Sequence, residues 1–173
     1  MVDLKEFEQK AADLRVLGMK ISIGQDTVYE KYWDEDCRRN IYSASKSFTS
    51  CAVGFAVQEG LIDLDERLMD AFKEDIPNNP DENLKKATVK DLLTMTLGQE
   101  KGFLMGKQRP RMEEQNWVKA SLAIPFVYEP GTHFVYNNVG PYLAGILVQR
   151  RAGCDLLSYL TPRLLKPLGI RKT

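Results

Sequence analysis

Histidine is the scarcest of the residues that commonly carry chemistry, since the 173-residue chain has only one, His133. A Ser-His-Asp triad could therefore use no other histidine, and a metal site built from several histidines is excluded. Cysteine is sparse as well. Cys37, Cys51 and Cys154 are odd in number and too scattered for a metal-binding pattern, so we interpret them as reduced thiols of a cytoplasmic protein. The sequence predicts neither a metal nor another cofactor.

Excess charge and long apolar runs are also missing. Lys and Arg total 24 and Asp and Glu total 24, so nothing in the charge balance indicates a nucleic-acid partner or an acidic membrane surface. No apolar stretch is long enough to span a bilayer, and residues 1–6 lack the basic start and apolar middle of a signal peptide. A length of 173 residues suits one domain or two small ones, and 43% hydrophobic residues are ordinary for a globular protein.

Residues 1–65 are predicted to form a partial α/β sheet region. Asp3 and Glu6 form a capping-box pattern at the start of an amphipathic helix over 3–17. Alternating apolar and polar residues, a turn and a run of β-formers then predict an antiparallel hairpin, at 19–23, 24–26 and 27–33. Because two strands alone are marginally stable, we expect the helix that follows Ser43, or further strands, to cover this hairpin.

Helices dominate the remainder. The run Cys51–Val57 is apolar on every side, so we expect a buried helix that starts near Ser43 and ends at Gly60. Further helices are predicted at 88–97, with Thr88 and Asp91 as a capping box and Gly98 after it, at 112–123, with Trp117 as a core anchor, and at 139–151 and 156–165. The fold class is therefore α+β, with a mostly helical domain at 66–173.

A polar, basic and glycine-containing segment, 99–111, interrupts these helices. We expect a mobile loop that could border a cleft, because loops on a rigid scaffold often carry function. The alternative is a solvated loop without a role.

Ser43 and Lys46 form an S-x-x-K arrangement at the start of the apolar helix. Three residues apart, they lie one turn from each other on the same face. A lysine packed there would be desolvated, so its neutral form could take a proton from the serine hydroxyl. The alternative is that Ser43 simply caps the helix and Lys46 extends to solvent.

A second group of polar residues, Tyr136-Asn137-Asn138, follows a turn-rich stretch and precedes a predicted helix. A lysine ammonium beside the hydroxyl of Tyr136 would favour the phenolate, which could relay the proton of Ser43 to a leaving group. The side-chain amide of Asn138 could hydrogen-bond both a lysine and a substrate carbonyl. Alternatively, Tyr136 is a buried aromatic with a satisfied hydroxyl and Asn138 a helix cap.

Five segments, in this order along the chain, carry a family resemblance. They are Tyr-Ser-Ala-Ser-Lys-Ser-Phe-Thr-Ser, Gly-Leu-Ile-Asp-Leu-Asp, Thr-Val-Lys-Asp-Leu-Leu-Thr-Met-Thr-Leu-Gly, Glu-Pro-Gly-Thr-His-Phe-Val-Tyr-Asn-Asn and Leu-Leu-Lys-Pro-Leu-Gly-Ile. Together they resemble the serine β-lactamase and penicillin-binding-protein family, on its class C and esterase side. The similarity runs from about Met19 to the last residue.

The resemblance implies roles and a fold. Ser43 matches the acylated nucleophile, Lys46 its lysine partner, Tyr136 the catalytic tyrosine and Asn138 the substrate-binding asparagine. Family members combine an antiparallel sheet, backed by helices, with a helical domain, and their site lies between the two. Their third motif, Lys/His-Thr/Ser-Gly on a later strand, is not found. We therefore expect an incomplete β-lactamase-like fold, the N-terminal portion of a longer protein.

The leading hypothesis is a serine hydrolase that forms an acyl-enzyme on Ser43 with a small-molecule ester, amide or peptide, β-lactams and D-amino peptides included. Alone, this chain is expected to be a poor enzyme, because a missing oxyanion donor costs about a hundred- to a thousandfold in rate. Uncovered apolar surface and an open strand edge would favour self-association or a complementing C-terminal half. The alternatives are a non-hydrolytic binding or sensor module of the same fold and a helical interaction protein with chance motifs.

Overall fold

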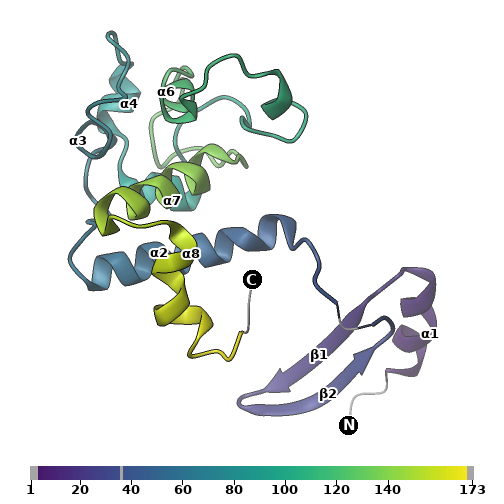
Figure 1. Ribbon diagram of the computed structural model, residues 1–173. Helices are drawn as coiled ribbons and strands as arrows, with labels where there is room; N and C mark the ends of the chain where they lie inside the picture. Colours follow the sequence, from purple (N-terminus) through teal and green to yellow (C-terminus); the bar gives the residue numbers. More distant parts are fainter. Residues whose placement is uncertain (1–3, 36, 171–173) are drawn as a thin grey trace. The chain divides into compact units, whose positions relative to one another are not determined.

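The chain divides into two compact units, Met1–Ile41 and Tyr42–Thr173, in a computed structural model that describes residues 4–35 and 37–170 (Figure 1). The fold class is α+β, as predicted: the described residues form mostly helices and one two-stranded antiparallel sheet. The helix that follows Ser43 packs against later helices and belongs with them to the second unit. The domain boundary expected after residue 65 stays a prediction.

The first unit consists of α1 (Lys5–Asp13), β1 (Gly18–Ile23) and β2 (Asp26–Tyr32). The strands pair antiparallel from Gly18 opposite Tyr32 to Ile23 opposite Asp26, which confirms the predicted hairpin. Helix α1 is joined to the sheet by the carboxylate of Glu8, which accepts hydrogen bonds from the side chains of Tyr29 and Lys31. This polar contact gives the short sheet a cover on one side.

Helix α1 is shorter than predicted. It ends at Asp13, and Arg15 then adopts a positive φ of 54°, so the chain leaves the helix before Leu17. Leu14, expected on the apolar face, is 72% exposed for that reason. The capping box expected of Asp3 lies outside the described residues.

The core of the second unit lies between α2 (Ser45–Gln58), α5 (Val89–Thr94), α7 (Val139–Ala152) and α8 (Leu156–Leu160). Its fully buried side chains include Val53, Leu92, Leu143, Leu147 and Tyr159. Shorter elements complete the unit: η1 (Tyr42–Ala44), α3 (Leu68–Ala71), α4 (Glu82–Lys86), η2 (Arg109–Arg111), α6 (Trp117–Leu122) and a π-helical turn, η3 (Thr161–Leu165). None of the helices in the described part of the chain is long and apolar enough to cross a membrane.

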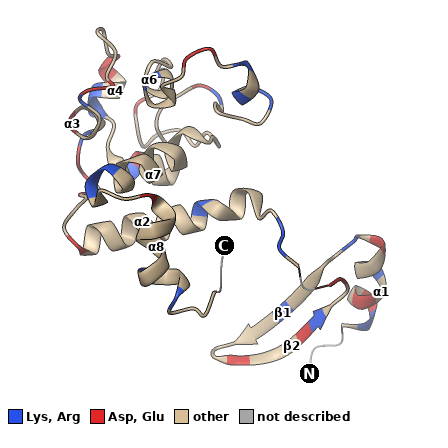
Figure 2. Ribbon diagram, viewed as in Figure 1, with Lys and Arg blue, Asp and Glu red and all other residues tan. Residues whose placement is uncertain are grey.

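Helix α2 is not buried on every side, so that prediction is wrong. Ala52, Val53 and Ala56 face the core, whereas Cys51 and Val57 are exposed. Lys46 is the only charged residue of the helix, which therefore carries little colour in Figure 2. An apolar helix with a single lysine near its start holds that charge next to Ser43.

Three other helices differ at their ends from the sequence prediction. The capping box of Thr88 and Asp91 is present, but α5 ends at Thr94, because Met95 takes the left-handed conformation that had been expected further on, at Gly98. Helix α6 begins only at Trp117, since the side chain of Asn116 caps it there. The helix expected over 156–165 divides into α8 and the π-helical turn.

Candidate functional site

Ser43 lies in η1, the single 3-10 turn that precedes α2. The turn begins at Tyr42 with φ at 47°, an uncommon conformation for a residue other than glycine, and such residues cluster at functional sites. Ala44, not Ser43, occupies the N-cap position of α2, and no side chain caps that helix. Ser43 is exposed, and its hydroxyl lies at the start of the helix without capping it.

The hydroxyl of Ser43 is the point at which three predicted site residues meet. Lys46 Nζ donates to Ser43 Oγ at 3.0 Å, across one helical turn. Tyr136 Oη donates to the same oxygen at 2.7 Å, although the two residues are 93 positions apart in sequence. The ammonium of Lys46 lies 5.2 Å from the centroid of the Tyr136 ring. The fold thus brings a hydroxyl, an amine and a phenol within bonding reach.

The phenol of Tyr136 is electrostatically biased toward its anion. Its hydrogen bond with Ser43, followed by its interaction with Lys46, lowers the pKa of Tyr136 below its ordinary value of 10.0, against an opposing effect of desolvation. The ring is 44% exposed, so Tyr136 is not the buried aromatic of the alternative interpretation. Lys46 is only partly buried, so the strong desolvation expected of it is not provided by the described chain.

Tyr136 is held in place by the residues on both sides of it. Val135 N donates to the carbonyl of Met95 at 2.9 Å, which ties the loop to the end of α5. Asn137, buried, accepts from Gly140 N at 3.0 Å and so caps the start of α7. A Cβ at Gly140 would stand 2.2 Å from the carbonyl oxygen of Leu92, so glycine permits the close packing of α7 on α5.

Sequence reasoning missed Asn137 as the residue that anchors this segment. Its signal was present, because an asparagine three residues ahead of a helical N–H is a frequent cap.

Asn138 makes contacts other than those expected. Its Nδ2 donates to the carbonyl of Leu104 at 3.0 Å and lies 3.5 Å from Met105 Sδ, and no hydrogen bond joins it to Lys46 within residues 4–35 and 37–170. The segment 99–111 is not solvated throughout, and its role beside a cleft stays a prediction. Gln99 and Leu104 are buried, and the segment borders the backbone that carries Tyr136. The apolar trio at 103–105, inside a polar stretch, was the signal that could have indicated this.

His133 does not complete a triad with Ser43. Its ring stacks on Tyr128 at 4.2 Å, and its Nδ1 lies 2.8 Å from Thr132 Oγ1, so its contacts are within its own turn. Among the described residues, no group of three or more His, Cys, Asp or Glu side chains is arranged to hold a metal ion.

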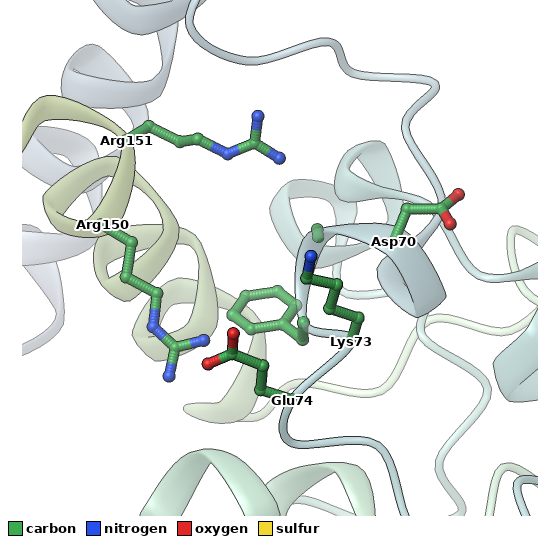
Figure 3. Close-up of a pocket in the computed structure, with 7 residues that line it drawn as sticks. Asp70, Lys73, Glu74, Arg150 and Arg151 are labelled. Carbon is green, nitrogen blue, oxygen red and sulfur yellow. The ribbon is translucent and has the colours of Figure 1, made fainter.

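A cavity of about 550 Å³ lies apart from these residues, between α3 and the end of α7. Figure 3 shows Arg150 and Arg151 on one side of it and Lys73 and Glu74 on the other, with Asp70 pointing away. Arg150 is paired with the buried Asp75, and Arg151 with Glu66. Both guanidinium groups that line this cavity therefore already have a carboxylate partner.

Comparison with known proteins connects the chain to a family. The family model described as Beta-lactamase matches residues 5–173. The chain is 31% identical over 157 residues to monacolin J acid methylbutanoyltransferase of Aspergillus terreus, covering 79% of this chain and 37% of that protein. It is 31% identical over 150 residues to lovastatin esterase of Penicillium rubens, covering 74% and 37% respectively. The chain thus spans well under half the length of these relatives.

Solved structures show the same fold. The octameric penicillin-binding protein homologue from Pyrococcus abyssi superposes with a TM-score of 0.73 at 25% identity, covering 99% of this chain and 44% of that one. A class C beta-lactamase superposes with a TM-score of 0.72 at 20% identity, covering 94% and 47%. The described fold is therefore a partial β-lactamase-like fold, as the sequence predicted.

Proposed function

The chain belongs to the beta-lactamase family, and we propose that it carries the nucleophile of a serine acyl-transfer enzyme, with Ser43 attacking an ester or amide carbonyl. One observation supports this proposal above all others. Lys46 and Tyr136 reach the same Ser43 oxygen, at 3.0 and 2.7 Å, from two distant parts of the sequence. A structural serine needs no such pair of partners.

The proposed proton route uses the phenol. In the phenolate form Tyr136 accepts the hydroxyl proton of Ser43 while the bond between Ser43 Oγ and the acyl carbon forms. The Lys46 ammonium stabilises the partial negative charge that develops on Ser43 Oγ. Tyr136 then returns that proton to the departing alcohol or amine as its bond to the acyl carbon breaks. Water or an acceptor alcohol, deprotonated in the same way, afterwards releases the acyl group and restores Ser43.

We propose the substrate class from the relatives and not from the structure. Two relatives are named for transferring a methylbutanoyl group and for cleaving an ester, so a small-molecule ester is the substrate that we propose first. Amides, β-lactams and D-amino peptides are further candidates through the same acyl-enzyme. Cytoplasmic location, proposed from the sequence, is compatible with a soluble small ester as substrate.

The activity of a complete protein is also part of the proposal, because this chain spans 37% of each of those two relatives. In that protein a Lys/His-Thr/Ser-Gly strand would supply a second oxyanion donor, the loss of which costs about a hundred- to a thousandfold. We propose that the isolated chain acylates slowly for that reason. A complementing C-terminal half would then raise its rate.

Labelling of the nucleophile tests the proposal directly. The chain is incubated with an alkyl fluorophosphonate and analysed by intact mass and by mapping of the labelled peptide. We expect one adduct on Ser43, lost in Ser43→Ala and retained in Ser47→Ala, which removes an exposed hydroxyl of the same helix. A folded chain that stays unlabelled, alone and after supplementation with a C-terminal half, would falsify the nucleophile.

Release of the acyl group separates the enzyme from its alternative, the binding or sensor module of the same fold. A chromogenic butanoyl ester releases one equivalent of its leaving group in either case. Continued turnover indicates an enzyme, whereas a stable acyl adduct on Ser43 indicates the sensor.

A further inference from the structure

Ser45, the first residue of α2, has a hydroxyl that lies against the turn in which Ser43 stands. Its Oγ donates to the carbonyl oxygen of Tyr42 at 2.6 Å, three residues back along the chain. Tyr42 has φ at 47°, a left-handed conformation that is sterically unfavourable for a residue with a Cβ. The hydrogen bond from Ser45 therefore stabilises a backbone conformation that a tyrosine does not favour by itself.

The same hydrogen bond fixes the orientation of one peptide plane. The carbonyl of Tyr42 and the N–H of Ser43 belong to a single planar, trans peptide unit, in which the two groups point in opposite directions. Because the carbonyl faces the hydroxyl of Ser45, the N–H of Ser43 points away from Ser45. An N–H at the start of a helical turn has no carbonyl one turn before it to bind. It is therefore placed to donate to a group outside the helix.

We propose that Ser45 is a positioning residue for the acylation of Ser43, because it holds the peptide plane that directs the Ser43 N–H at the carbonyl oxygen of the substrate. This inference rests on the proposed function of Ser43. As Ser43 Oγ bonds to the acyl carbon, one electron pair of the C=O bond moves to the carbonyl oxygen, and the hydroxyl proton goes to the Tyr136 phenolate. The electron pair restores the C=O bond when the leaving group departs. A well-aimed donor stabilises the charged oxygen between these two events.

The contacts of Ser45 separate it from the residues that move the proton. Lys46 Nζ and Tyr136 Oη reach the side-chain oxygen of Ser43, whereas the hydroxyl of Ser45 donates to a backbone carbonyl. Loss of that hydroxyl should therefore weaken stabilisation of the substrate oxygen and leave the pH dependence of acylation as it is. Ser45 is exposed and alanine is the best helix former, so Ser45→Ala should retain α2.

An ester and its thiono analogue test this role. Two p-nitrophenyl butanoyl esters are compared, one with a carbonyl oxygen and one with sulfur in its place, so that only the atom that takes up the charge differs. Sulfur is a weak hydrogen-bond acceptor, so a directed N–H favours the oxygen ester. Release of p-nitrophenolate is followed in single turnovers with the full chain in excess. We expect Ser45→Ala to lower the oxygen-to-sulfur rate ratio about three- to tenfold, the contribution of one hydrogen bond.

Two further variants of α2 serve as controls. Ser45→Thr keeps a hydroxyl at the same position and should restore the wild-type ratio. Ser47→Ala removes another exposed hydroxyl of the helix and should leave the ratio unchanged. The midpoint of the rate–pH profile should be the same in Ser45→Ala as in the wild type.

The outcomes separate this inference from the function on which it rests. An unchanged ratio in folded Ser45→Ala, a ratio that Ser45→Thr does not restore, or a displaced pH midpoint overturns the role of Ser45 and leaves Ser43 as the nucleophile. If the wild type reacts with neither ester, or Ser43→Ala releases p-nitrophenolate as fast as the wild type, the proposed function fails and the inference falls with it.

Discussion

Two tyrosines of the second unit, Tyr136 and Tyr159, have opposite environments although each has a cation over its ring. Lys46 lies 5.2 Å from the Tyr136 centroid, and Arg163 lies 3.9 Å from that of Tyr159. The pKa of Tyr136 is lowered, first by the hydrogen bond with Ser43 and then by Lys46. The pKa of Tyr159 is raised, first by desolvation and then by its hydrogen bond to Glu59.

The difference lies in the burial of the two tyrosines and in the partner of each hydroxyl. Tyr159 is 1% exposed and donates to a carboxylate, which would repel a phenolate. Arg163 is already paired with that same carboxylate, since its Nε and Nη2 lie 2.6 and 3.1 Å from the two carboxylate oxygens of Glu59. Tyr136 meets a hydroxyl and an ammonium instead. The pKa of Tyr136 is therefore lowered and that of Tyr159 raised, although each tyrosine has a cation over its ring.

Tyr136→Phe should have the largest effect. Loss of the proton acceptor is expected to slow fluorophosphonate labelling of Ser43 by about 10²–10⁴-fold, the usual contribution of a general base. Folding should be retained, because the ring is 44% exposed and loses only its hydroxyl. Tyr159→Phe is the control and should leave the labelling rate nearly unchanged, as followed by intact mass. Equal losses in both variants would remove the distinction between the two tyrosines.

Lys46→Met should move the pH dependence of labelling. Deprotonated Tyr136 is the active form in our proposal, so the rate rises with pH through the lowered pKa of Tyr136. Without the ammonium that pKa returns toward 10.0, and the midpoint moves to higher pH. Each unit of this movement costs about tenfold in rate at neutral pH. Rate–pH profiles of both proteins measure the movement, and coincident profiles would show that Lys46 does not act through the phenol.

When stability is measured, Tyr159→Phe should have a larger effect than Tyr136→Phe, the reverse of their order in the labelling experiment. The variant loses a partly buried hydrogen bond to Glu59, which should lower the free energy of unfolding by about 0.5–1.5 kcal/mol, while Arg163 continues to pair with the carboxylate. Tyr136→Phe should change that free energy less, since its hydroxyl is at the surface. Urea unfolding followed by circular dichroism gives both values. A greater loss for Tyr136→Phe would contradict the structural role of Tyr159.

Glu59→Gln should give the smallest effect, a difference in stability from the wild type that is present at neutral pH and disappears in acid. Arg163, followed by Tyr159, lowers the pKa of Glu59 below its ordinary value of 4.5. A carboxylate with a lowered pKa adds to the free energy of unfolding above pH 4.5, and this addition is lost as the pH falls through the lowered pKa. The wild type should therefore lose this contribution in acid, and Glu59→Gln should not. Melting temperatures from neutral pH down to about 3 compare the two slopes.

Sequence reasoning succeeded where the signal is local. The hairpin, the capping box of Thr88 and Asp91, and α7 were predicted from alternation, caps and helical periodicity. It failed at helix ends such as Thr94 and Asp13, where the left-handed residues Met95 and Arg15 are not glycines. It also failed for the exposed side of α2, because composition does not say which neighbours a helix has.

For the candidate site, the S-x-x-K spacing, the segment Tyr136-Asn137-Asn138 and the family resemblance together indicated Ser43, Lys46 and Tyr136. Only the tertiary structure decided that these three side chains converge, which partners the Asn138 amide has, and that the pKa values of Tyr136 and Tyr159 shift in opposite directions. These depend on through-space contacts between segments far apart in the chain, and the sequence order of residues carries no information on such distances until the core has packed.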